Sequence, residues 1–188
     1  MNQQLFAITS FLIIMGTTIP YMFDIVAGRA KPARAARLMF FILLLFALIQ
    51  QHNLGSGYTL VVTLAEFVSS ALLLGLALKY GVGGLSKSDK LCYTLLAFDL
   101  VVWATTRNAL LALHLTVIAD FVSMWPTLEK TWRQPTSETP LFYWGGVIAP
   151  LLSIVAGADF SYAVILFPLY LSLINLLEIV LIARRSRA

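Results

Sequence analysis

The sequence predicts an all-α integral membrane protein with seven transmembrane helices, arranged as two parallel three-helix repeats joined by a linker helix. Hydrophobic residues make up 60% of the chain and charged residues 12%, against roughly 25% charged residues in a soluble domain. The hydrophobic residues form continuous runs close to the roughly 20 residues that a helix needs to cross a bilayer. Because the runs do not alternate between apolar and polar residues, we expect helices rather than membrane β-strands.

The first repeat contains helices predicted at Leu5–Val26, Ala35–Gln51 and Tyr58–Tyr80. Each is an apolar run bounded by charged or glycine-containing sequence, and such boundaries mark helix ends. The first helix has Pro20 in its interior, where a proline removes one backbone hydrogen bond and kinks the helix. We interpret this helix as a retained span, because no basic cluster precedes it and no clear cleavage site follows it.

The linker and the second repeat complete the predicted bundle. The linker helix is expected at Lys90–Thr106, and it allows both repeats to cross the membrane in the same direction. The helices of the second repeat are predicted at Asn108–Lys130, Pro140–Ala156 and Phe160–Ala183. The resulting units are 1–84 for the first repeat, 85–106 for the linker, and 107–188 for the second repeat with its basic tail.

Two segments of the chain share one organisation. Both Ile19–Phe41 and Trp125–Trp144 contain a helix proline, a polar loop with a second proline, and aromatic residues that open the next apolar run. This repetition indicates that the chain arose by duplication. Pro20 and Pro126 occupy matching positions in the two copies, so both are candidate hinges.

The charged residues predict the orientation in the membrane. With the N-terminus outside, 12 of the 13 Lys and Arg residues fall in cytoplasmic segments, and only Arg107 falls outside. The positive-inside rule therefore predicts a multi-pass protein of the plasma (inner) membrane, with its C-terminus in the cytoplasm. The lipid bilayer also accounts for the sequence pI of about 9.4, so we expect no nucleic-acid partner.

Ionisable side chains inside membrane helices are costly, and they often mark pathways for solutes or protons. Glu66, Asp99, His114 and Asp120 lie inside the predicted helices and are the candidates for proton coupling. Asp120 comes first among them because its counterpart in the first repeat, Ile14, is apolar. For each acid, a buried structural hydrogen bond is the alternative.

Three further residues are candidates for binding a solute. Asn175 is in the middle of the last predicted helix, and Ser70 is its approximate counterpart in the first repeat. Trp125 lies one residue before Pro126, where an aromatic side chain could form the wall of a pocket. For Asn175, hydrogen bonding between helices is the alternative.

Catalytic and metal-binding residues are not expected. A single cysteine, Cys92, excludes an internal disulfide and a multi-cysteine metal site, and the two histidines fall in different segments. No cofactor is predicted; retinal would need a lysine in the last helix, which has none. We therefore expect a protein that is not an enzyme, and the sequence leaves open whether it forms a homo-oligomer.

The arrangement of three helices, a linker and three more, with prolines in the first and fifth, resembles the SWEET sugar transporters and the wider PQ-loop superfamily. The closest local match is Pro126-Thr127, followed by Lys130-Thr131 and Pro140. Neither repeat has the Pro-Gln dipeptide, which favours the superfamily over its sugar-specific branch. The vitamin-transporting PnuC relatives share the same helix layout.

The resemblance implies a transporter that moves a small polar solute, a sugar being one candidate, by alternating access. The solute would bind near the bilayer midplane between the two three-helix bundles, with Asn175 among its contacts. A PnuC-like vitamin carrier and a proton-coupled carrier of amino-acid type remain open. A non-transporting membrane subunit or sensor is the alternative from another class, and it predicts no water-accessible cavity between the bundles.

Overall fold

The computed structural model describes the fold of residues 2–32, 34–82, 87–135, 138–157 and 159–184. Within these ranges every regular element is helical, which confirms the all-α prediction. The elements are α1 (Asn2–Val26), α2 (Arg34–Asn53), the 3₁₀ turn η1 (Gly57–Thr59), α3 (Leu60–Tyr80), α4 (Lys87–Thr106), α5 (Ala109–Arg133), α6 (Pro140–Ala156) and α7 (Tyr162–Ala183).

The C-terminal ends of α1, α3, α4 and α7 and both ends of α6 agree with the predicted ones, and the other boundaries differ by one to three residues. Asn108 caps α5, because its side chain accepts a hydrogen bond from the backbone nitrogen of Leu111 at 3.0 Å and so satisfies a free donor at the helix start. The other end of α5 extends to Arg133, three residues beyond the prediction. Helix α1 continues without a break through Pro20, and α5 continues through position 126, whose side chain lies outside the described residues.

Five segments are long and apolar enough to cross a membrane: α1, α2, η1 with α3, α5, and α7. This supports the expected membrane protein. The apolar part of α4 (Tyr93–Thr106) and the whole of α6 are shorter.

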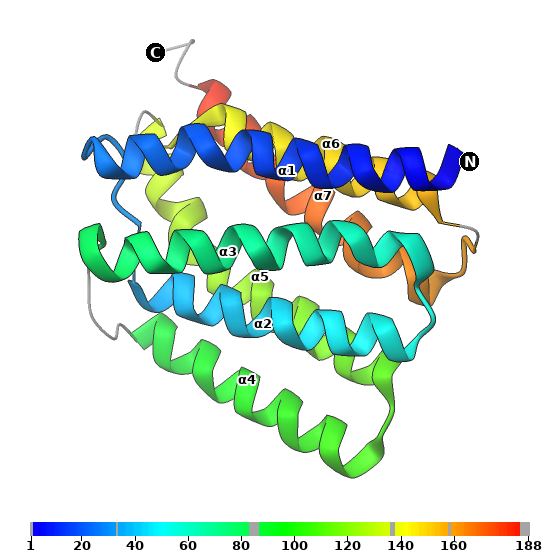
Figure 1. The fold of residues 1–188 in the computed structure, drawn as a ribbon. Coiled ribbons are helices and arrows are strands. Elements are labelled where there is room, and N and C mark those ends of the chain that lie inside the picture. The colour runs from blue at the N-terminus through cyan, green and yellow to red at the C-terminus, as the bar shows by residue number, and fades with distance from the viewer. Residues whose placement is uncertain (1, 33, 83–86, 136–137, 158, 185–188) are drawn as a thin grey trace.

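The helices form two groups of three with the same packing order. Helix α3 packs between α1 and α2, and α7 packs between α5 and α6. The groups meet where α1 contacts α6 and where α2 contacts α5, and α4 packs mainly on α5 at the edge of the bundle (Figure 1). We call α1–α3 the first unit and α5–α7 the second unit.

Helices α1, α3, α5 and α7 finish at one end of the bundle. The described residues at or just after these helix ends include several cations, so we call it the basic end: Arg29, Lys31, Lys79, Lys130, Arg133 and Arg184. In Figure 1 the N-terminus lies at the other end, which we call the opposite end. Two apolar clusters join the units in the half nearer the opposite end. One contains Leu44, Leu113 and Phe167 from α2, α5 and α7, and the other contains Val62 and Ala149 from α3 and α6.

Candidate functional site

A cavity of about 420 Å³ lies between the two units and extends from the basic end past the middle of the bundle. Its volume is in the range of about 300–1,000 Å³ found for small-molecule sites. All the helices except α4 contribute to its wall, together with loop residues at the basic end such as Lys31 and Glu138. Its deep part reaches Glu66, which lies 14 residues before the end of α3, or about 21 Å along the helix axis.

The position of the cavity follows from where apolar side chains connect the units. In the basic half, Tyr21, Ile25 and Leu73 form a cluster within the first unit, and Leu128 and Ile174 belong to a cluster within the second unit. The large clusters between the units are in the other half. Near the basic end the cavity lies between the units, which touch there on the α1–α6 side, where the ring of Tyr21 stacks on that of Phe142 with centroids 4.6 Å apart.

Arg37 is the charged residue of α2 that lines the cavity. Its Nη2 donates a hydrogen bond to the hydroxyl of Tyr21 at 3.1 Å. Its guanidinium carbon lies 5.4 Å from the centroid of the Tyr21 ring and 5.8 Å from that of Phe142, distances at which aromatic rings stabilise a cation. Among the described residues, no carboxylate forms an ion pair with Arg37.

A second cation in the wall, Lys130 of α5, is paired. It forms an ion pair with Glu138, whose side chain is nearly buried. The hydroxyl of Tyr143 donates a further hydrogen bond to Oε2 of Glu138 at 3.0 Å. The residues of this network all belong to the second unit, and Glu138 is also close enough to Arg37 of the first unit for its charge to act on it.

Two carboxyl groups occupy the deep part of the cavity. Glu66 is 6% exposed, and within the described residues it has neither an ion pair nor a hydrogen-bond partner. Asp120 is 1% exposed and accepts a hydrogen bond from the Tyr170 hydroxyl at Oδ2, at 2.5 Å. Glu66 is close enough to Asp120 and to Arg37 for their charges to act on it.

Asn175 also lines the cavity, from α7. Its Nδ2 donates to the backbone oxygen of Leu171 at 2.8 Å, which leaves its Oδ1 available to a ligand. Gly146 of α6 lies directly against the amide, because a Cβ atom at this position would be 2.5 Å from both Cγ and Oδ1 of Asn175. A glycine here thus allows α6 and α7 to approach closely.

The other solute-binding candidates lie elsewhere. Ser70 is buried in α3 but is not part of the cavity wall. Trp125 is 58% exposed, beside Phe121 on the outer surface of α5, with ring centroids 6.5 Å apart. Of the three candidates, only Asn175 is in a position to contact a ligand in the cavity.

Asp99 and His114 are also outside the cavity wall. Asp99 of α4 is fully buried and accepts a hydrogen bond from the Thr116 hydroxyl at 2.6 Å. The ring of His114 forms hydrogen bonds with the backbone oxygen of Leu110 at 2.7 Å and with the hydroxyl of Tyr162 at 2.6 Å. The hydrogen bond of Asp99 joins α4 to α5, and those of His114 lie within α5 and join α5 to α7. Asp120 and Glu66, in contrast, line the cavity.

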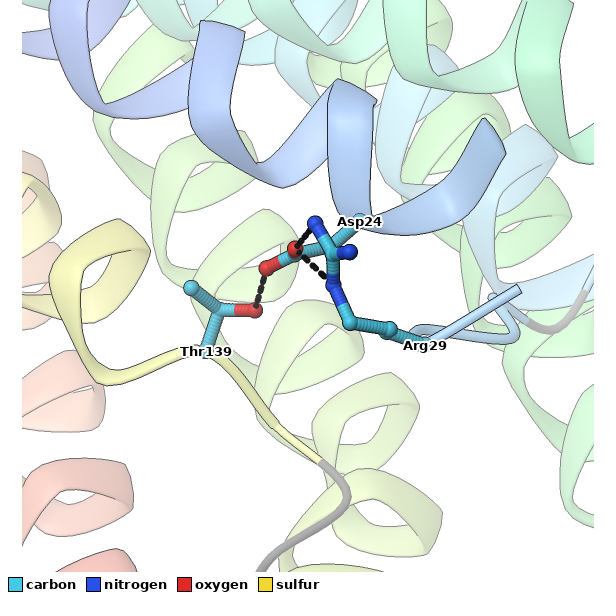
Figure 2. Close-up of polar contacts among 3 residues, drawn as sticks. All are labelled: Asp24, Arg29 and Thr139. Carbon is cyan, nitrogen blue, oxygen red and sulfur yellow. Dashed lines mark hydrogen bonds and ion pairs between the residues drawn. The ribbon is translucent and has the colours of Figure 1, made fainter. Parts of the chain in front are cut away.

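A polar contact joins the two units at the basic end (Figure 2). Asp24, near the end of α1, holds Arg29 through Oδ1 at 2.6 and 2.8 Å. Its Oδ2 accepts a hydrogen bond from the hydroxyl of Thr139 at 2.7 Å. Since Thr139 immediately precedes α6, this contact keeps the α1–α6 side of the cavity mouth together.

Sequence reasoning missed several of these residues. Arg37 was counted among the cytoplasmic loop charges, although it lies one turn inside α2 and half-buried. The signal available was its position just before the apolar run that starts at Leu38.

Within the described residues, no group of three or more His, Cys, Asp or Glu could hold a metal ion. Comparisons with models of known protein families, with curated proteins and with solved structures give no match for this chain.

Proposed function

We propose that this protein carries a small polar solute across the membrane by alternating access. The observation that carries the proposal is the cavity between the two units, which extends from the basic end to the deep acids and is closed beyond them by the apolar clusters. A binding site reached from one side only is one of the two states that such a carrier needs. With seven crossings and the N-terminus outside, the open side is the cytoplasmic one.

The positions that line the cavity support an origin by duplication. Pro126 follows Pro20 by 106 residues, and the same offset relates the three lining residues of α1 to three lining residues of α5. The pairs are Ile14 with Asp120, Thr17 with Ser123, and Tyr21 with Thr127.

The offset holds for the next helix of each unit. It relates the three lining residues of α2 to those of α6, in the pairs Ala36 with Phe142, Arg37 with Tyr143, and Phe40 with Gly146. In this correspondence α1 is equivalent to α5, and α2 is equivalent to α6. The contact between α1 and α6 is therefore equivalent to the contact between α5 and α2, and both are present. We infer that the cavity lies on the pseudo-two-fold axis of two parallel repeats, as in carriers built this way.

Alternation requires the units to separate at the opposite end while they close at the basic end. Pro20 and Pro126 are in the two helices that contribute equivalent walls, and each removes a backbone hydrogen bond from its helix. Bending at these two positions would change the angle of α1 and α5 around the bound solute. Neighbouring helices satisfy the freed carbonyl groups in such bent membrane helices.

The test measures whether a reagent reaches the cavity from the basic side and whether the protein transports a solute. In a Cys92→Ser background, Ser123→Cys places a thiol in the cavity wall, and Thr105→Cys places a control thiol on the exposed surface of α4. Reconstituted in liposomes, the wild type should take up at least one labelled solute from a panel of sugars, amino acids and vitamins. A membrane-impermeant thiol reagent applied from the basic side should block the Ser123→Cys variant and leave the control active.

Two results would contradict the proposal. If the Ser123→Cys thiol does not react from the basic side, the cavity is not open to solvent there. If no solute in the panel crosses while the protein remains folded, a non-transporting subunit or sensor becomes the better interpretation.

A further inference from the structure

The wall of the cavity contains four ionisable side chains that form no ion pair among the described residues: Lys31, Arg37, Glu66 and Asp120. Arg37 at the mouth has no carboxylate partner among the described residues, and of the five hydrogen-bond donors of a guanidinium group it uses one, toward Tyr21. Glu66 and Asp120 in the deep part have no basic partner there. Lys130 and Glu138, in contrast, form an ion pair with each other.

The charges are also placed asymmetrically with respect to the repeat. The counterpart of Arg37 in the second unit is Tyr143, and the counterpart of Asp120 in the first unit is Ile14. Duplication alone would give a cavity with equivalent walls, but each of these two groups is present at only one of its two equivalent positions. The result is a cavity with the basic groups Lys31 and Arg37 near its mouth and two carboxyl groups at its deep end.

We propose that this cavity binds a dipolar solute with the chemistry of a free amino acid, whose carboxylate contacts Arg37 and whose ammonium group contacts Glu66 and Asp120. This inference rests on the proposed transport function and specifies its substrate class. A guanidinium group is the side chain best suited to hold a carboxylate, through two parallel hydrogen bonds. Two carboxyl groups in reach of each other suit an ammonium group, which has three donors.

The polar residues between these charges fit the middle of such a solute. Asn175 has a free Oδ1, and its amide is fixed by the bond to Leu171 and by the close approach of Gly146. The Tyr170 hydroxyl holds Asp120 in place through Oδ2. A neutral sugar would satisfy Asn175 but would offer no counter-charge to Arg37 or to either acid.

The experiment measures binding to the purified full-length protein by thermal unfolding. The probes are the individual L-amino acids, glucose, and two derivatives of every amino acid that binds: its methyl ester, which lacks the carboxylate, and its N-acetyl form, which lacks the ammonium group. At least one amino acid should raise the unfolding temperature. Its methyl ester, its N-acetyl form and glucose should not.

Variants assign the two ends of the solute. Arg37→Gln should weaken amino-acid binding by about ten- to a hundredfold, the loss expected for hydrogen bonds between charged groups, and Glu66→Gln should have an effect of similar size. The matched controls are Arg34→Gln, an exposed cation on the same helix, and Glu129→Gln, an exposed acid on α5. Both controls should bind like the wild type.

Further results would overturn the inference while leaving the transport proposal intact. If glucose or an N-acetyl amino acid stabilises the protein as well as the free amino acid does, the charges do not select the solute. The same holds if Arg37→Gln and Arg34→Gln bind equally well, or if no amino acid binds while another solute of the uptake panel is transported. Failure of every solute to cross the membrane concerns the transport function instead.

Discussion

Gly146→Ala gives a sharp test of how α6 and α7 position Asn175. The added methyl group would lie 2.5 Å from Cγ and Oδ1 of Asn175 and 2.7 Å from its Nδ2, far inside normal contact distance, so the amide must move. Overpacking of this kind costs about 1–3 kcal/mol. Replacing glycine by alanine inside a helix returns about 0.5–1 kcal/mol. The net expectation is a loss of up to about 2.5 kcal/mol.

A second variant separates this clash from other effects. In an Asn175→Ala background the three atoms that the methyl group would meet are gone, so Gly146→Ala should be neutral or should stabilise by about 0.5–1 kcal/mol. The double-mutant cycle therefore predicts a coupling energy of about 1–3 kcal/mol between the two positions. Gly75→Ala serves as the control, because no atom lies within 4 Å of the Cβ that would be added there.

The assay is reversible unfolding in mixed micelles, followed by tryptophan fluorescence, and it needs no knowledge of the solute. Gly75→Ala should show the same small effect in both backgrounds. An equal loss of stability from Gly146→Ala with and without the Asn175 side chain would refute the reasoning, since it would mean that the methyl group does not meet the amide. Gly146→Ala should also weaken solute binding, because it displaces Asn175 in the cavity wall.

Three other outcomes are expected. In a cysteine-free background, Asn53→Cys should react with an impermeant thiol reagent from outside intact cells and Arg29→Cys only after permeabilisation; the reverse pattern would contradict the predicted orientation. Asp120→Asn should bind the solute more weakly, because it removes one of the two carboxyl groups proposed to hold the ammonium group; at saturating solute it should still exchange solute at equilibrium but fail to concentrate it under a pH gradient. A wild type coupled to one proton should accumulate solute up to about tenfold per pH unit, and a wild type that is indifferent to the gradient would remove the coupling hypothesis. Thr139→Val should lower stability by about 1.5–3 kcal/mol, the scale for a hydrogen bond to a charged group, and no loss would mean that the contact with Asp24 is not maintained in the membrane.

The helices could be predicted from the sequence because their apolar runs are set by the bilayer. The start of α6 at Pro140 and its end at Ala156 agree with the prediction, since proline at a helix start and glycine just after its end are strong local signals. Contacts between helices are different, because they depend on which face of each helix meets a neighbour. Trp125 shows the consequence: its position near the helix proline suggested the wall of a pocket, and it lines a small hollow on the outside of α5 with Leu91, Phe121 and Val122, but it is not part of the cavity between the units.

The candidate site was predictable in part, through the alignment of the two prolines. That alignment relates Ile14 to Asp120, and both line the cavity. Arg37 could not be recognised in this way, because a cation close to a predicted loop has the same sequence pattern whether it faces water or a cavity. The burial of Glu138 could not be predicted from the sequence either. It accompanies the ion pair with Lys130, and the two residues lie on either side of a loop.

The closed half of the bundle also determines where the membrane potential acts. Water in the cavity brings the potential of the basic side to the depth of Glu66, about 21 Å along α3, so the electric field is concentrated across the packed layer that remains. A charge that passes this layer crosses most of the potential, which corresponds to about 2.3 kcal/mol per elementary charge per 100 mV. Transport of a solute with net charge should therefore depend steeply on voltage, although the movement that carries it is short.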